Sequence, residues 1–131
     1  MSGNQEKPSF NMKDMEKWLE NYFLDPLTNY LDETTFRVDI FETEKEYILE
    51  ALLTDFKPED VTVFLKDCEI QIKAKPSINA HSETAYLARS IQLPFIVTDK
   101  HVHATFIEGI LEVFISKEKP GFGNNQFVTI S

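Results

Sequence analysis

The sequence is short of cysteine and of basic residues. Cys68 is the single cysteine among 131 residues, so it closes no intramolecular disulfide and forms no multi-cysteine zinc site. We expect it to be a small residue of a strand. Only 13 Lys and Arg stand against 22 Asp and Glu, which gives a net charge of −9. This deficit argues against nucleic acid and anionic membrane surfaces as partners, because both are bound through a surplus of positive charge.

Signals for export, membrane insertion and catalysis are also missing. No apolar run approaches the roughly 18 residues that a membrane span needs, and the first residues, MSGNQEKPSF, lack the pattern of a signal peptide. We therefore expect a cytoplasmic location. There is no glycine-rich phosphate loop, so we expect neither ATP use nor another cofactor. His101 and His103 lie two apart without nearby acidic or cysteine ligands, and nothing orients Cys68 toward His81. We expect no metal site, no catalytic residue and no enzyme activity.

What is present is enough apolar material for one domain with tails. Hydrophobic residues make up 42% of the chain and there are eleven Phe. A chain of this size can bury about two-thirds of its surface. Between residues 11 and 23, apolar residues recur at spacings of three and four, which predicts an amphipathic helix. Pro26 should end it near Asp25, and Leu27 to Thr35 reads as a linker. The apolar stripe consists of Met12, Met15, Trp18, Leu19, Tyr22 and Phe23.

The period changes to two between Phe36 and Ser116, which indicates strands. Seven short strands at spacings of roughly 8 to 12 residues, without a helix long enough for a parallel crossover, predict an all-β fold. We expect an antiparallel, immunoglobulin-like β-sandwich with a short N-terminal helix and a flexible C-terminal tail. A hairpin turn is expected at Glu108 and Gly109, where glycine reaches a positive φ without a Cβ clash. Three segments result: an arm (1–34), the sandwich (35–117) and an extension (118–131).

The order of four segments resembles the α-crystallin domain of small heat-shock proteins, the Hsp20 family. The segments are FRVDIFETEKEYILEALL, PEDVTVFLKDCEIQIKA, ARSIQLP and HATFIEGILEVFISK. The most specific match is Ala104, Gly109 and Leu111, which have the spacing of the family signature before the last strand. The short arm, EKWLENYFLDPLTNYLDET, looks more like the spore-coat branch of endospore-forming bacteria.

The resemblance implies several sites. Val128 and Ile130 match a C-terminal pair of aliphatic residues that docks in a groove of a neighbouring copy, with Val63, Leu65, Val102 and Ala104 as candidate walls. The alternative is that this apolar tail folds back as an edge strand of its own domain. Arg89 matches an arginine that pairs with a carboxylate or a carbonyl at an interface, and an ordinary surface salt bridge is the alternative. The helix stripe either docks on the sandwich or binds unfolded proteins or other copies.

The sequence departs from the family in two places. Leu53-Thr54 stands where the family has a Pro-Gly pair, so we expect a differently shaped turn. The segment between Ala74 and Arg89 is short for the bacterial branch, which argues against a dimer formed by strand exchange through this loop.

Three functions follow as hypotheses. The first is an ATP-independent chaperone of the small heat-shock type that forms homo-oligomers and holds unfolded client proteins. The second is a structural component of the spore coat, located there and bound to spore-coat proteins, that uses the same self-association. The third is a monomeric co-chaperone sandwich of the related CS type.

Overall fold

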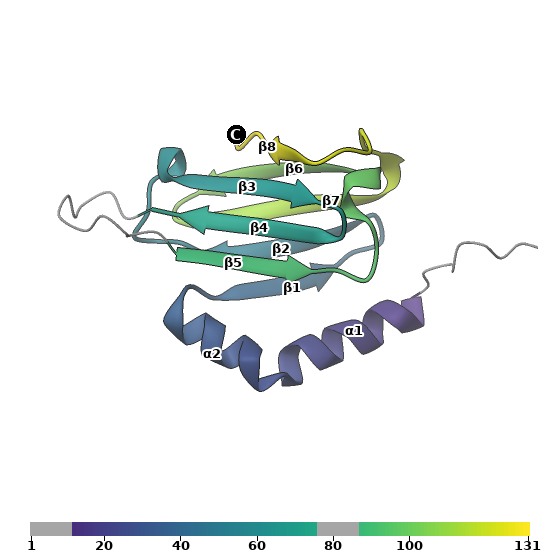
Figure 1. Ribbon diagram of the computed structural model, residues 1–131, viewed down its shortest axis with the longest axis horizontal. Coiled ribbons are helices and arrows are strands. Elements are labelled where there is room, and N and C mark those ends of the chain that lie inside the picture. Colours follow the sequence, from purple (N-terminus) through teal and green to yellow (C-terminus); the bar gives the residue numbers. More distant parts are fainter. Residues whose placement is uncertain (1–11, 76–86) are drawn as a thin grey trace, which may run out of the picture.

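The computed structural model describes residues 12–75 and 87–131, and the side chains from Met15 onward (Figure 1). Two helices come first, α1 (Met12–Leu24) and α2 (Pro26–Thr34), and the remainder is mainly strand. Two short 3-10 helices, η2 (Pro58–Asp60) and η3 (Val97–Asp99), lie between strands. The strands are β1 (Val38–Glu42), β2 (Glu46–Leu52), β3 (Val61–Lys66), β4 (Glu69–Ala74), β5 (Leu87–Gln92), β6 (Lys100–Ile107), β7 (Ile110–Pro120) and β8 (Gln126–Val128).

Helix α1 confirms the predicted amphipathic helix, but the predicted linker after it is wrong. Residues 26–34 form α2, because Asp25 accepts a hydrogen bond from the Leu27 N–H and caps the new helix. Pro26 is the first residue of α2, a position where its fixed φ suits a helix and its missing N–H costs nothing. The same proline therefore ends one helix and starts the next. Residue 11, at the start of the predicted helix, lies outside the described residues.

The strands form two antiparallel four-stranded sheets, and the predicted sandwich is confirmed. The order is β1-β2-β7-β6 in one sheet, here called sheet A, and β5-β4-β3-β8 in the other, sheet B. Burial alternates along most strands, as it does in β2, where Tyr47, Leu49 and Ala51 are buried. The inward residues of both sheets form one continuous apolar core.

Two hairpin turns show how backbone conformation is set locally. Glu108 and Gly109 both have positive φ, of 50° and 80°, as the predicted turn between β6 and β7 requires. The expectation that Cys68 lies in a strand is wrong. It lies in the turn between β3 and β4, beside Asp67, which has a φ of 53°. A two-residue turn there lets Lys66 pair directly with Glu69.

The two ends of the described chain lie on opposite sides of the sandwich (Figure 1). Helices α1 and α2 run along the side where β1 of sheet A and β5 of sheet B are the edge strands, which we call the first seam. The C-terminal residues lie along the opposite side, between β6 and β3, the second seam. The C-terminal segment expected to be a flexible tail is partly in strands in this structure, because β7 continues to Pro120 and β8 adds to sheet B.

Candidate functional sites at the two seams

The C-terminal tail joins the two sheets across the second seam. Strand β8 pairs with β3, placing Val128 opposite Val63. Two residues later, Ile130 forms a parallel bridge with Ala104 of β6. The Ser131 N–H donates to the Ala104 carbonyl at 3.0 Å, and the Phe106 N–H donates to the Ser131 carbonyl at 3.2 Å. The tail thus adds main-chain hydrogen bonds to both sheets.

The proposed wall residues do come together around this tail. Val63, Leu65 and Ala104 are buried and Val102 is partly buried, while Val128 and Ile130 pack against the same core. A shallow groove of about 330 Å³ follows the tail and is lined in part by Val61, Val63, Val128 and Ile130. Within one chain, the tail therefore occupies the chain's own groove, which is the fold-back alternative. Docking in a neighbouring copy stays a prediction.

Arg89 organises the first seam from a fully buried position. It lies on β5 and is 2% exposed. One terminal nitrogen, Nη1, donates to Asp32 Oδ1 at 2.7 Å and to the Phe36 carbonyl at 2.9 Å, and Nη2 donates to the Tyr22 hydroxyl at 3.1 Å. The surface salt bridge offered as an alternative is therefore wrong. Both predicted types of acceptor are present, but they belong to this same chain, to Asp32 of α2 and to Phe36 just before β1.

The same side chains cover the outer edge of β1. Because the Leu52 N–H donates to the Arg37 carbonyl, Val38 directs its N–H and C=O away from β2. The Val38 N–H donates to Asp32 at 3.3 Å, and the Tyr22 hydroxyl donates to the Val38 carbonyl at 3.0 Å. An uncovered strand edge is a template for pairing with other chains. The helices thus mask the edge of β1 at Val38.

The apolar stripe of α1 is largely turned toward the sandwich. Met15 is completely buried, Trp18, Leu19 and Tyr22 are partly buried against the core, and Phe23 is exposed. The Trp18 and Tyr22 rings stack with centroids 5.5 Å apart. The structure does not describe the side chain of Met12. Of the two predicted roles of the stripe, this arrangement corresponds to docking on the sandwich.

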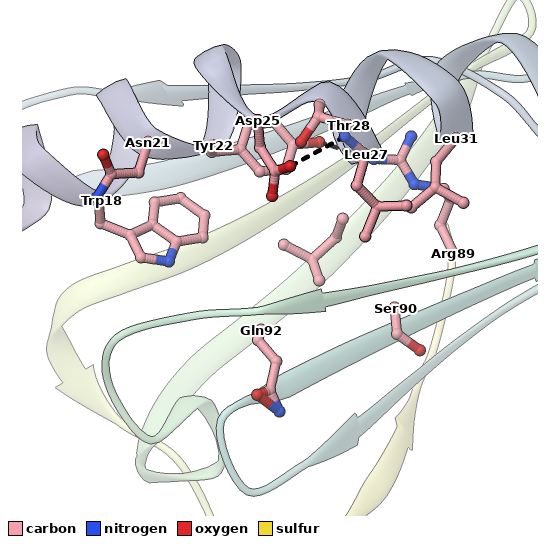
Figure 2. A pocket seen from close by; sticks show the side chains of 11 residues that line it. Trp18, Asn21, Tyr22, Asp25, Leu27, Thr28, Leu31, Arg89, Ser90 and Gln92 are labelled. Atoms are coloured by element: carbon pink, nitrogen blue, oxygen red, sulfur yellow. Dashed lines mark hydrogen bonds between the residues drawn. The ribbon is translucent and has the colours of Figure 1, made fainter.

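A cleft of about 300 Å³ remains between the helices and β5 (Figure 2). Trp18 and Tyr22 come from α1, Leu27 and Leu31 from α2, and Arg89 from β5. Figure 2 shows the Trp18 ring facing this space, with Ser90 and Gln92 on the strand opposite. The cleft shows that the contact between arm and sandwich is incomplete, so separating them loses less packing than opening a close-packed interface.

Burial raises the pKa of the Tyr22 hydroxyl above its ordinary value of 10.0, and this effect outweighs the neighbouring positive charge of Arg89, which lowers it. A raised pKa in the folded state means that stability is complete below about pH 10 and falls as the pH rises through the folded pKa. We expect the first seam to loosen in this alkaline range. Trp18 is the single tryptophan, so its emission should shift to longer wavelength as the ring is exposed. The shift should be absent or displaced in Tyr22→Phe, and an identical profile in both proteins would contradict the assignment.

The sequence pattern does not identify the partners of Arg89, because Tyr22 fits the apolar stripe and Asp32 lies in the predicted linker. The signal that points to them is the Asp-Pro pair at residues 25 and 26, which is typical of a helix start and places Asp32 on a second helix.

The histidine pair adds no chemistry to these sites. The His101 and His103 rings have centroids 5.8 Å apart, and His103 stacks on Phe114 at 4.7 Å. Within residues 12–75 and 87–131, no group of three or more His, Cys, Asp or Glu is arranged to hold a metal ion. No helix in these same ranges is long and apolar enough to cross a membrane.

Comparison with known proteins agrees with this geometry. The model of the Hsp20/alpha crystallin family matches residues 39–131, which includes the tail and all strands of the sandwich except the first residue of β1. The chain belongs to the Hsp20/alpha crystallin family. Proteins of this family are not enzymes, and neither is this chain.

Related proteins differ in how much of their length is shared. The chain is 31% identical to spore coat protein M of Bacillus subtilis over 118 residues, covering 90% of this chain and 85% of that protein. It is 34% identical to small heat shock protein C4 of Rickettsia felis over 93 residues, but covers only 57% of it. Heat shock protein HSP.16.4 of Streptococcus thermophilus is 30% identical, with 75% of this chain and 79% of that protein covered.

Solved structures show the same fold. A variant of hsp14.1 from Sulfolobus aligns with a TM-score of 0.55 at 24% identity, covering 79% of this chain and 97% of its own. The hspA protein of Xanthomonas axonopodis gives 0.52 at 22% identity, with 65% and 95% covered. The residues that resemble the family signature, Ala104, Gly109 and Leu111, lie on or between β6 and β7, where Ala104 and Leu111 face the core.

Proposed function

We propose that the protein is an ATP-independent holdase that forms homo-oligomers and binds apolar surface of unfolding proteins. The observation that supports this best is the state of the α1 stripe, whose Met, Trp and aromatic side chains cover the first seam with a cleft beneath them. Met and aromatic side chains adapt to many shapes. Burial of apolar surface is non-directional, so a stripe released from the seam tolerates many client sequences.

The assembly step uses the tail. Val128 and Ile130 point the same way from an extended segment, and burying two such side chains contributes about 1.5 to 3 kcal/mol each. Because the groove and the tail exist in every copy, a tail that leaves its own groove can fill that of a neighbour at little net cost. We propose this exchange as the link between copies.

One experiment compares the full chain with a chain lacking residues 127–131. We expect the full chain to have a higher native mass and to suppress light scattering from a heated client protein at about equal molar ratio. The truncated chain should form smaller assemblies, because it lacks the tail residues Val128 and Ile130 that would occupy the groove of a neighbouring copy. A full chain that suppresses no scattering would remove the holdase proposal. An unchanged native mass after truncation would remove tail-mediated assembly and favour the monomeric CS-type alternative.

A structural role in the spore coat is the second candidate, favoured by the 31% identity to spore coat protein M over 90% of this chain. In this case the same self-association builds a layer, and no client is bound. Localisation in a sporulating cell separates the two: a coat component must gather on the forming spore, and a general holdase must not be confined there.

A further inference from the structure

The outward face of sheet B carries one aromatic ring on β3 in otherwise polar surroundings. Along β3 and β4 the outward residues alternate with buried ones, and cross-strand pairs bring them together in three rows. These six residues are Thr62, Phe64, Lys66, Glu69, Gln71 and Lys73. Phe64 is the single apolar side chain among the six. Its ring exposes apolar surface to water unless a second apolar group covers it.

The tail supplies a second ring for this position. Phe127 of β8 lies directly opposite Phe64. The two ring centroids are 4.8 Å apart and the ring planes are tilted by 55°. This separation lies within the range of about 4.5 to 7 Å in which aromatic pairs attract each other. Phe127 itself is 68% exposed, so it serves as a cover for Phe64 and is not part of the core.

The pairing pattern places the two rings where side chains approach each other most closely. Hydrogen-bonded and non-hydrogen-bonded pairs alternate along antiparallel strands. The Leu93 N–H donates to the carbonyl of Cys68, which lies opposite it in the register of β4 and β5, and this bond sets the alternation across sheet B. Carried through β4 and β3, the alternation makes Phe64 and Phe127 a non-hydrogen-bonded pair, the kind in which side chains are closer. The register of β8 on β3 therefore brings the rings together.

The tail thus contacts β3 from both faces of sheet B. Val128 lies opposite Val63 and packs against the core, whereas Phe127, one residue earlier, points outward. The two contacts differ in what they can select. Aliphatic side chains of similar volume replace one another in an apolar groove at small cost. The outer contact needs a ring on both strands, because aromatic attraction arises from the charge distribution of two π systems.

We propose that Phe127 is a third anchor of the tail and that Phe64 is its receptor, so that the tail selects a β3 strand with an aromatic ring at position 64. The neighbour that fits this tail is a second copy of this chain, which presents both the aliphatic groove and the ring. Specificity of this kind is a difference between two affinities, here for grooves with and without the ring. The selection of a neighbour rests on the tail exchange proposed above, whereas the ring contact within one chain does not.

Hydrogen exchange in the full chain measures how firmly the tail is held. The Ser131 N–H donates to the Ala104 carbonyl, so its protection from exchange reports docking of the tail. We expect Phe127→Ala and Phe64→Ala each to lower this protection about two- to tenfold, the range that measured aromatic pairs span. The double variant should lose little more than either single one, because each substitution already removes the whole contact.

Matched controls separate the ring contact from the loss of any phenylalanine. Phe122→Ala changes an 83% exposed ring of the same extension, and Phe41→Ala changes a 47% exposed ring on sheet A. Neither should alter the protection of Ser131. Phe64→Tyr keeps the ring and should retain the protection, whereas Phe64→Leu keeps only apolar bulk and should lower it. Circular dichroism and urea midpoints verify that the variants fold. Equal protection in Phe127→Ala and the unmodified protein, or an equal loss in the controls, would overturn the proposal.

A mixture of two variants tests the choice of neighbour. Phe127→Ala keeps the receptor ring but lacks the ring of the tail, and Phe64→Ala has the reverse arrangement. Each alone should associate more weakly than the unmodified protein in sedimentation velocity. In an equimolar mixture the intact tail of one variant meets the intact receptor of the other, so the average mass should exceed that of either variant alone. A mixture that gives only the mean of the separate results would overturn the selection of a neighbour.

Failure of the ring anchor can be told apart from failure of the tail exchange. If the chain that lacks residues 127–131 keeps the native mass of the full chain, the exchange fails, and the protection of Ser131 still decides whether the rings anchor the tail within one chain. If this truncation lowers the native mass while Phe127→Ala and Phe64→Ala change neither mass nor protection, the exchange stands and the ring anchor is wrong.

Discussion

Arg89→Ala is expected to lower the free energy of unfolding by about 3 kcal/mol. Breaking a buried ion pair by removing one partner costs roughly 3 to 5 kcal/mol, and the value here should fall at the lower end because the Asp32 side chain is 24% exposed. The substitution also leaves the Phe36 carbonyl without its donor and the Tyr22 hydroxyl without one partner. Urea unfolding at a fixed protein concentration measures the change, since assembly makes stability depend on concentration.

Arg37→Ala is the matched control for this experiment. Arg37 pairs with Asp39 at 3.1 Å, but its side chain is 63% exposed, and exposed pairs contribute about 0 to 1 kcal/mol. The two arginines should therefore differ by at least about 2 kcal/mol. Equal losses would contradict the view that Arg89 holds the N-terminal helices on the sandwich. In Arg89→Ala, the emission of Trp18 should also move to longer wavelength under native conditions.

Gly109→Ala is expected to cost about 3 kcal/mol. Its φ of +80° belongs to the left-handed region, where a side chain costs roughly 1 to 3 kcal/mol. An added Cβ would also lie 2.6 Å from the Cα of Thr54, which is backbone and has little freedom to move. The Gly109 carbonyl accepts the Leu53 N–H at 2.7 Å, so a shift of the turn breaks a hydrogen bond.

Gly123→Ala separates the cost of the positive φ from the cost of the contact between the added Cβ and Thr54. Gly123 has nearly the same φ, +79°, but nothing lies within 4 Å of an added Cβ. It should lose only the conformational share, about 1 kcal/mol. A difference of about 2 kcal/mol between the two alanine variants would measure the contact with Thr54. If Gly109→Ala unfolds no earlier than Gly123→Ala, the close approach of the β6–β7 turn to Thr54 is not a constraint.

The sandwich could be predicted from the sequence because the pattern that specifies each strand lies within a few neighbouring residues. Alternation of buried and exposed residues fixes which side of each strand faces the core, and a slip of one residue would turn Leu111, Val113 and Ile115 outward. Likewise, the positive φ of Gly109 follows from a two-residue hairpin turn. The location of the tail groove between β3 and β6 came from the family resemblance and not from a pattern in the residues.

The rest depends on contacts between segments far apart in the sequence. Asp32 and Arg89 are 57 positions apart, and no spacing rule joins a residue of α2 to one of β5. Composition alone does not predict the contacts of the tail either. Its glycine and asparagine residues suggest mobility, although the main chain of Ser131 is hydrogen-bonded to β6. In the exchange proposed above, occupation of the chain's own groove or of a neighbour's groove depends on protein concentration, which no sequence pattern contains.

The closing of both seams by the two ends of the described chain has a practical consequence for labelling. A fluorescent protein fused after Ser131 would place its bulk against Ala104 and displace the tail from its groove, so a fusion could report a location that its own attachment created. Cys68 is a less disruptive position for a label, because it is the single thiol, is partly exposed and lies in the turn between β3 and β4 rather than in the tail. A maleimide dye at this position would report the location of the protein and leave the tail paired with β3 and β6.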